Sequence, residues 1–135
     1  MARIIEIEGI GPAHKQTLKE RAGITTTEAL LEACKTPKQR EELAAKAGFG
    51  EKLLLKWANM ADLFRIKGVG EEYSQLLEVG GVDTVVELAK RKPENLLTAL
   101  KEANDRKPMV RRMPTLEQVQ DWVKQAKALP RMLKY

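Results

Sequence analysis

The 135-residue sequence contains few aromatic residues, one cysteine and one histidine. Aromatic residues make up 4% of the chain, which argues against a surface on which single-stranded nucleic acid stacks its bases. With Cys34 as the single cysteine, the chain has no internal disulfide and no cysteine metal site. His14 has no second histidine or acidic trio near it in the sequence. We therefore expect His14 to be an exposed helical residue rather than a metal ligand.

Catalytic and membrane signatures are also missing. No apolar run approaches the length of a membrane span, and the N-terminus has no signal-peptide core, so we expect a protein of the reducing cytoplasm. The sequence has no nucleophile elbow, no Walker phosphate loop and no metal-ligand spacing. Its paired glutamates are neighbours on predicted helices and do not converge as an acid and a base would. We expect no enzymatic activity, no required cofactor and no membrane partner.

The charge is concentrated in one segment of an otherwise ordinary globular composition. Charged residues make up 32% of the chain, apolar residues 43%, and the net charge is +5 at pH 7. Residues 90–112 hold eight basic and three acidic side chains, an excess equal to that of the whole chain. Such a cluster is typical of a phosphate-binding patch or of a solvated loop that aids solubility. Its basic members are Lys90, Arg91, Lys92, Lys101, Arg106, Lys107, Arg111 and Arg112.

Two glycines flanking one aliphatic residue occur twice, at residues 9–11 and 68–70, each time after an apolar pair. Glycine tolerates a positive φ, so each triplet is predicted to reverse the chain between two helices, with its middle residue pointing into a core. Pro12 suits the first turn of the following helix. The unpaired N–H groups of such a helix start attract anions, phosphate above all. A plain helical hairpin without a ligand fits the same pattern.

Glycine, proline and threonine punctuate a series of amphipathic helices. Thr25 and Thr26 are both N-cap candidates, and Thr25 with Glu28 would form a capping box. Trp57 and Trp122 lie on apolar faces, so we expect them to anchor cores rather than to stack on bases. Helices are expected over residues 12–22, from Thr25 or Thr26 to Cys34, over 38–46, 51–63 and 71–79, from Thr84, from Pro93, and from Thr115 to Leu129.

The second half repeats the order of the first. The offset is 59 from Gly9 to Gly68, 58 from Gly23 to Gly81 and 65 from Trp57 to Trp122. The change in offset indicates roughly seven added residues, which we place in a basic loop over residues 101–114. We predict an all-α fold of two units, 1–62 and 63–135, in one compact domain. Each unit is completed by a tryptophan-bearing helix.

The sequence resembles tandem helix-hairpin-helix proteins. It does so at G-I-G-P-A and K-G-V-G-E, which are followed by A-G-I-T-T and G-G-V-D-T. With the A-D-L-F-R-I-K-G-V-G-E-E-Y junction and the two tryptophan helices, nearly the whole chain is similar to the DUF4332 family, for which no activity is carried over. The resemblance implies two helix-hairpin-helix units. In that broader superfamily, hairpin N–H groups bind DNA phosphates without reading sequence, sometimes with a monovalent cation held by hairpin carbonyls.

The resemblance further implies which residues would contact DNA. In the first hairpin they are the backbones of Gly9, Ile10, Gly11 and Ala13, with Lys15 and Lys19. In the second hairpin they are Gly68, Val69 and Gly70, with Lys67. From the charge cluster we add Arg106, Lys107, Arg111 and Arg112.

The two hairpins are unequal in charge. Glu71 and Glu72 lie in the first helical turn after the second hairpin, where carboxylates stabilise the helix dipole but repel an anion. The first hairpin has no carboxylate there, although Glu6 and Glu8 precede it, so it is the better predicted phosphate site. Our leading hypothesis is a sequence-nonspecific module that binds duplex or junction DNA. The alternative is a protein-interaction or self-assembling scaffold module, which the paired glutamates and the modest net charge favour.

Overall fold

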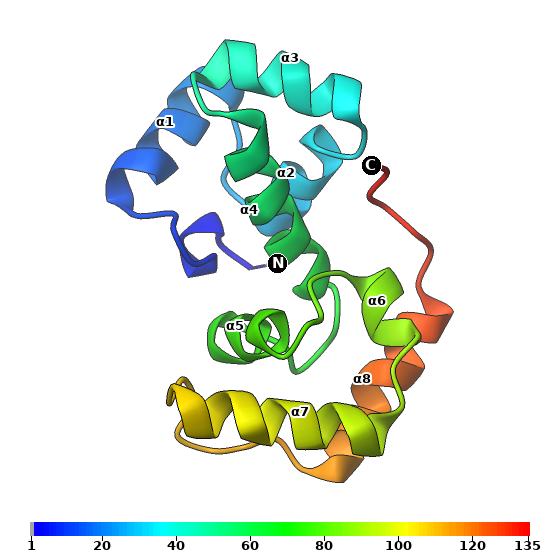
Figure 1. Cartoon of the computed structure of the whole chain (residues 1–135). Coiled ribbons are helices and arrows are strands. Elements are labelled where there is room, and N and C mark those ends of the chain that lie inside the picture. Colours follow the sequence, from blue (N-terminus) through cyan, green and yellow to red (C-terminus); the bar gives the residue numbers. More distant parts are fainter. Residues whose placement is uncertain (1) are drawn as a thin grey trace. The chain divides into compact units, whose positions relative to one another are not determined.

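The computed structural model describes residues 2–135. Within this range the chain forms eight α-helices, one short 3₁₀ helix and no strand, which confirms the predicted all-α class (Figure 1). None of the helices in these residues is long and apolar enough to span a bilayer. In chain order the elements are η1 (Ile4–Glu6), α1 (Pro12–Ala22), α2 (Thr27–Ala33), α3 (Pro37–Ala47), α4 (Glu51–Leu63), α5 (Glu71–Val79), α6 (Val85–Ala89), α7 (Pro93–Arg106) and α8 (Leu116–Ala128).

Prolines and glycines set many of the helix boundaries. Pro12, Pro37 and Pro93 lie in the first turns of α1, α3 and α7, where a missing N–H costs nothing. Gly23 and Gly48 end α1 and α3 in the left-handed conformation, with φ of 67° and 82°. These punctuation residues explain why the predicted and observed helices agree closely.

Threonine hydroxyls cap α2, α6 and α8, none of which has an initial proline. Thr26 Oγ1 accepts a hydrogen bond from the N–H of Ala29 at 3.1 Å, so Thr26 rather than Thr25 begins α2. Thr84 caps α6 in the same way. Thr115 and Gln118 form a reciprocal capping box at the start of α8.

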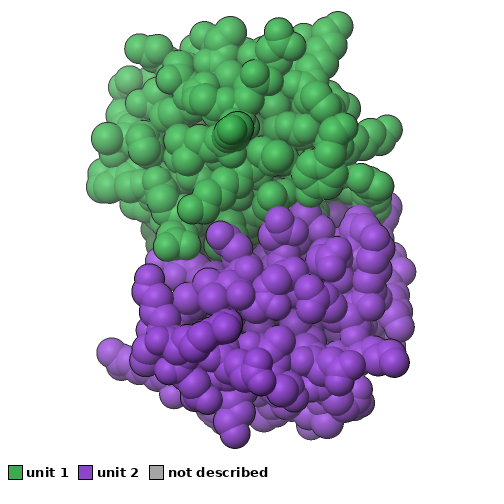
Figure 2. All heavy atoms as spheres, in the orientation of Figure 1, with its two compact units in different colours: residues 1–62, 131–135 green, residues 63–130 purple. Residues whose placement is uncertain are grey.

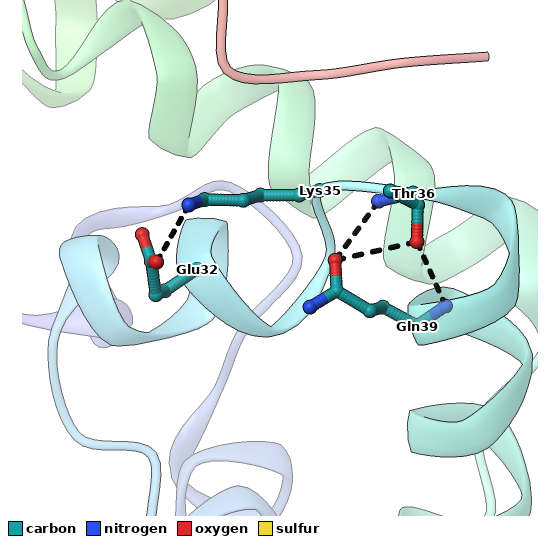
Figure 3. A network of polar contacts seen from close by, with 4 residues as sticks. All are labelled: Glu32, Lys35, Thr36 and Gln39. Atoms are coloured by element: carbon teal, nitrogen blue, oxygen red, sulfur yellow. Dashed lines mark hydrogen bonds and ion pairs between the residues drawn. The ribbon is translucent and has the colours of Figure 1, made fainter.

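Polar contacts also fix the connection between α2 and α3 (Figure 3). Thr36 Oγ1 accepts from the N–H of Gln39 at 3.2 Å, and the N–H of Thr36 donates to Gln39 Oε1 at 3.2 Å. Lys35 Nζ lies 2.6 Å from Glu32 Oε1, at the end of α2. The capping box gives hydrogen-bond partners to two N–H groups at the start of α3 that have none within the helix. It thereby fixes the start of α3 shortly after the end of α2.

The chain divides into two compact units (Figure 2). Unit 1 contains residues 1–62 and 131–135, and unit 2 contains residues 63–130. Our predicted division placed residues 131–135 with the second unit, whereas the structure packs them with the first. Within unit 1, α1 packs against α3; within unit 2, α8 packs against α6 and α7, and α5 packs against α7.

Each unit has its own apolar core. Trp57 of α4 and Trp122 of α8 are 0% and 2% exposed, so the prediction that both tryptophans anchor cores is confirmed. Buried side chains of unit 1 include Ile4, Ile7, Ile10, Leu18, Leu30, Leu43 and Leu54. Those of unit 2 include Leu63, Ile66, Val69, Leu76, Leu88, Leu100, Val110 and Val119.

Residues 131–135, which we call the C-terminal strap, are held on unit 1 without forming a helix. Leu133 is buried. The N–H of Lys134 donates to the carbonyl of Lys35 at 2.8 Å. Tyr135 Oη donates to Asn59 Oδ1 at 3.0 Å. The strap therefore adds both apolar burial and backbone hydrogen bonds to a unit formed mainly by the start of the chain.

A buried arginine links the strap to α3. Arg40 donates from Nη1 to the carbonyl of Cys34 and from Nη2 to the carbonyl of Lys134, both at 2.8 Å. Burial raises the pKa of the Cys34 thiol from 9.0 to about 11, although the nearby Arg40 charge lowers it. The neutral thiol is buried and packs as a small apolar residue.

The structure corrects the predicted loop over residues 101–114. Leu96, Leu100 and Ala103 recur at helical spacing on a buried face, so α7 continues to Arg106. Only the part after α7 is a loop, and we call residues 107–113 the basic loop. Lys101 and Arg106 of the charge cluster therefore lie on the last turns of a helix.

Candidate functional site

Two turns with the same backbone geometry precede α1 and α5. We call residues 9–11 the first turn and residues 68–70 the second turn. The leading glycine has a φ of 93° in the first turn and 96° in the second, a region that favours glycine. The trailing glycine of each turn is extended and forms the N-cap of the next helix. The sequence repeat is thus matched by a repeat in backbone conformation.

The middle residue of each turn is buried and its N–H is already engaged. Ile10 donates to the carbonyl of Ile7, and Val69 donates to the carbonyl of Ile66, both at 3.1 Å. Ile10 and Val69 are 3% and 4% exposed. Their N–H groups therefore close the turns, and an anion at either turn would be bound by other donors.

The first residues of α1 and α5 supply those other donors, because the first N–H groups of a helix have no partner within it. Pro12 has no N–H, so α1 offers Ala13 and His14. Residues 71–73 of α5 include no proline and offer three N–H groups. The helix after the second turn thus offers one more donor, although two of its first three residues, Glu71 and Glu72, carry exposed carboxylates.

A tryptophan lies against the leading glycine of each turn. A Cβ added at Gly9 would lie 3.3 Å from Nε1 of Trp57, and a Cβ added at Gly68 would lie 3.1 Å from Nε1 of Trp122. The indole rings thus lie so close to the turns that a side chain at either glycine would press on them. This contact explains why each repeat pairs a glycine turn with a tryptophan-bearing helix.

The repeat also places a ring on each tryptophan from the third residue of the helix after the turn. The ring of His14 lies 5.3 Å from that of Trp57 at 52°, and the ring of Tyr73 lies 5.2 Å from that of Trp122 at 55°. His14 and Tyr73 are 59 positions apart, the same offset as the leading glycines. His14 and Tyr73 therefore occupy equivalent positions of the two repeats, where one has imidazole nitrogens and the other a hydroxyl.

His14 is half-buried, not exposed as the sequence led us to expect. Its ring also meets that of Phe49 edge-on at 5.2 Å. Its Nδ1 lies 3.2 Å from the carbonyl oxygen of Gly9. His14 therefore packs against the first turn and has a structural role within unit 1.

A glutamine of α8 holds the segment that enters the second turn. The N–H of Lys67 donates to Gln125 Oε1 at 2.9 Å, and Gln125 Nε2 donates to the carbonyl of Lys67 at 3.1 Å. Gln125 Nε2 also donates to Asp121 Oδ2 at 2.8 Å. The amide thus fixes the backbone of Lys67, whose side chain is exposed.

The charge cluster is divided between the two ends of α7. Residues 90–92 lie before its first turn, whereas Lys101 lies about 12 Å along the helix and Arg106 and the later cations lie about 20 Å or more of chain rise away. Arg91 at the first end is engaged: it donates to the carbonyl of Gly81 at 2.9 Å and lies 3.5 Å from Glu87. Lys90 and Lys92 remain exposed at the first end, and the larger group of exposed cations lies at the second end.

The basic loop is held by an asparagine of α7. Asn104 Oδ1 accepts from the N–H groups of Met109 and Val110 at 2.8 and 3.1 Å. Asn104 Nδ2 lies 3.4 Å from the carbonyl oxygen of Val110. Val110 is 7% exposed and belongs to the core of unit 2. The first half of the loop thus has a defined backbone.

A tyrosine ties the second half of the loop to α5. Tyr73 Oη donates to the carbonyl of Arg112 at 2.9 Å. Because Tyr73 lies in the first turn of α5, this bond places the basic loop beside the helix start that follows the second turn. Within unit 2, the basic loop therefore lies beside the helix that follows the second turn.

A family model, Domain of unknown function (DUF4332), matches residues 8–129. The chain belongs to this family. A search of curated proteins and a search of solved structures found no match. The DUF4332 match covers both turns and the basic loop, so the site described above lies within the family's own domain.

In this DUF4332 chain the predicted contact residues fall into two groups. In unit 1 the first turn is followed on α1 by Lys15 and Lys19, which are exposed and four residues apart on one helix face. In unit 2 the structure brings the second turn together with the basic loop. That second group contains Lys67, Gly68, Val69, Gly70, Lys107, Arg111 and Arg112, with Arg106 at the end of α7.

Three residues of the DUF4332 site were missed from the sequence: Tyr73, Asn104 and Gln125. Each binds backbone atoms of a segment that carries predicted contact residues. The repeat offset gives a signal for Tyr73, because it pairs that residue with His14. The repeat gives no comparable signal for Asn104 or Gln125, because among the described residues of unit 1 no side chain makes the equivalent contact.

Proposed function

We propose that this protein is a non-catalytic, sequence-nonspecific DNA-binding module. It contacts backbone phosphates through the first N–H groups of α5 and through the cations of the basic loop. The observation that carries this proposal is the 2.9 Å hydrogen bond from Tyr73 Oη to the carbonyl of Arg112. It joins a helix N-terminus, which favours anions, to an exposed pair of arginines.

The charge balance supports the second turn despite its two glutamates. The second turn, the end of α7 and the basic loop carry six exposed cations: Lys67, Lys101, Arg106, Lys107, Arg111 and Arg112. Against them stand five exposed carboxylates: Glu71, Glu72, Glu102, Asp105 and Asp121, the last bound to the Gln125 amide that holds Lys67. Arginine binds phosphate through a planar fork of donors, so the adjacent Arg111 and Arg112 are suited to successive phosphates of one strand. Contacts to phosphates position a protein without specifying a sequence, which is why we propose nonspecific binding.

The first turn supplies a second contact point in this proposal. The first helical turn of α1, which follows residues 9–11, contains no carboxylate. The N–H groups of Ala13 and His14 lie in that helical turn. Lys15 and Lys19 are exposed on the same helix. A phosphate there would meet fewer cations than at the second turn, but also no competing carboxylate within the helical turn.

Fluorescence anisotropy with duplex, junction and single-stranded DNA at several salt concentrations tests the proposal. Affinity should fall steeply with salt, because each neutralised phosphate releases counterions. Replacing Arg111 and Arg112 with alanine should reduce the slope of log affinity against log salt by about two units. No binding at low salt, or an affinity that is flat with salt, would contradict the proposal.

A matched control uses the other end of α7. Replacing Lys90 and Lys92 with alanine removes the same net charge but leaves the basic loop intact. We expect this variant to lose less of the salt slope than the arginine variant. Equal losses would show that binding follows net charge alone and not the basic loop.

A protein-interaction or self-assembling module is the second candidate, and a hollow in unit 1 favours it. The hollow has a volume of about 490 Å³ and lies among the end of α1, α2 and α3. Its floor includes Ala22, Ile24 and Leu43, and Glu32 and Glu42 lie at its edge. The rest of its lining includes Gln39 and Lys46, so the hollow is mixed in character, and its volume is within the range that binds ligands or side chains of a partner.

A further inference from the structure

The basic loop combines a fixed backbone with exposed cationic side chains. Its backbone is bound at three places: by Asn104, by the burial of Val110 and by Tyr73. Arg111 directly follows Val110, Arg112 accepts the bond from Tyr73 at its carbonyl, and both arginines are exposed. A loop that served only solubility would gain nothing from such anchoring, because solvated charges need no fixed position.

The anchors act at the two sides of the arginine pair. Asn104 accepts two consecutive N–H groups, at Met109 and Val110, directly before Arg111. Tyr73 binds the carbonyl of Arg112 itself, while its ring rests on Trp122 in the core of unit 2. Both anchors bind backbone atoms, so the arginine side chains remain available to a ligand.

We propose that Tyr73 and Asn104 are positioning residues that hold Arg111 and Arg112 ready for the phosphates of a nucleic-acid backbone. This inference rests on the proposed function. A loop fixed before binding loses less conformational freedom when it meets its ligand, so its contacts contribute more to affinity. Tyr73 has a second role, since it fixes the loop to the helix start whose N–H groups face the same anion.

Tyr73→Phe is the most direct test, because it keeps the ring on Trp122 and removes only the hydroxyl. We expect duplex affinity to fall by about three- to fivefold, the worth of one hydrogen bond. The salt slope should stay unchanged, because no cation is lost. Tyr135→Phe is the matched control: it removes a hydroxyl that donates to Asn59 in unit 1, and it should leave affinity unchanged.

Asn104→Ala tests the other anchor. Amide hydrogen exchange at Met109 and Val110 should become faster, because both N–H groups lose their acceptor. Affinity should fall, again with an unchanged salt slope. Circular dichroism and thermal melting verify that each variant is folded. If Asn104→Ala proves to be unfolded, Tyr73→Phe still tests the inference independently.

A double-mutant cycle separates positioning from a general effect on the fold. In a protein that already carries Arg111→Ala and Arg112→Ala, Tyr73→Phe should have no further effect on affinity. If Tyr73→Phe binds as tightly as the unaltered protein, or if its effect persists without the arginines, the positioning role is wrong while DNA binding stands. If the unaltered protein does not bind DNA at all, the proposed function fails first and this inference with it.

Discussion

At the scale of the residue, the two glycines of the second turn do different things. Gly68 has a φ of 96°, and a side chain there would meet the indole of Trp122 at 3.1 Å. Gly70 is extended, with φ of −117°, and a Cβ there would meet nothing within 4 Å. Backbone strain and the tryptophan contact therefore require glycine at the first position only.

Gly68→Ala should lower the free energy of unfolding by about 2 kcal/mol, because alanine is strained at this φ and Trp122 must shift. Gly70→Ala is the control in the same turn and should cost less than about 1 kcal/mol, the difference between glycine and alanine at an N-cap. Urea denaturation measures both. Equal losses would mean that the positive φ and the indole contact do not determine the stability of the turn.

At the scale of the element, the C-terminal strap acts through its backbone. Arg40 is buried, and one of its two hydrogen bonds goes to the carbonyl of Lys134 rather than to a side chain. Leu133 adds an apolar side chain to the core of unit 1. Removing the strap would therefore expose apolar surface and leave part of a buried guanidinium without its partner.

Deletion of residues 131–135 should lower the free energy of unfolding by about 3 kcal/mol, the sum of the lost burial of Leu133 and the lost hydrogen bonds. Lys134→Ala keeps the carbonyl and should change stability by less than about 0.5 kcal/mol. Thermal or urea unfolding measures both variants. A deletion as stable as the full chain would mean that the strap is not part of unit 1.

Most helices could be predicted because local residues determine their ends. The bounds of α4 and α5 agree with the predicted 51–63 and 71–79, since Gly50 precedes α4 and glycines flank α5. The choice between Thr25 and Thr26 needed the structure, because both carry a hydroxyl at a helix start. The end of α7 was missed, because its charged last turns resemble a loop until Ala103 is seen to be buried.

The candidate site could be predicted only in part. The two turns are local in sequence, so their repeated glycines, with Pro12 after the first, were enough to locate them. The bond between Tyr73 and Arg112 joins residues 39 positions apart, and that between Arg40 and Lys134 joins residues 94 positions apart. No local pattern predicts which backbone carbonyl a distant side chain will meet. The assignment of the two turns to the helix-hairpin-helix class stays a prediction.

At the scale of the whole molecule, the surface offers charge more than apolar area. Among the described residues, large hydrophobic side chains that are clearly exposed are few and lie on different elements: Leu53, Val79, Leu116 and Tyr135. Stable dimers are usually formed by contiguous apolar patches with well-packed cores. The distribution of exposed groups therefore favours the DNA-binding proposal over self-assembly.

Size-exclusion chromatography with light scattering should give a single species of 15.2 kDa, the mass of one chain, at both low and high salt. Exposed large hydrophobic side chains are few among the described residues, and each unit carries only two of them. A discrete oligomer without DNA affinity would instead support the scaffold function. A monomer that binds DNA would support the proposed function.

The C-terminal strap has a consequence for how the protein is made. Unit 1 takes its last five residues from beyond unit 2, so the ribosome must translate residues 63–130 before it reaches the segment that completes unit 1. At about 5–20 residues per second, those 68 residues take about 3–14 s. During that interval the nascent chain carries a first unit whose Arg40 has the carbonyl of Cys34 but not that of Lys134. Unit 2 is contiguous in the chain, so its folding need not wait for the strap.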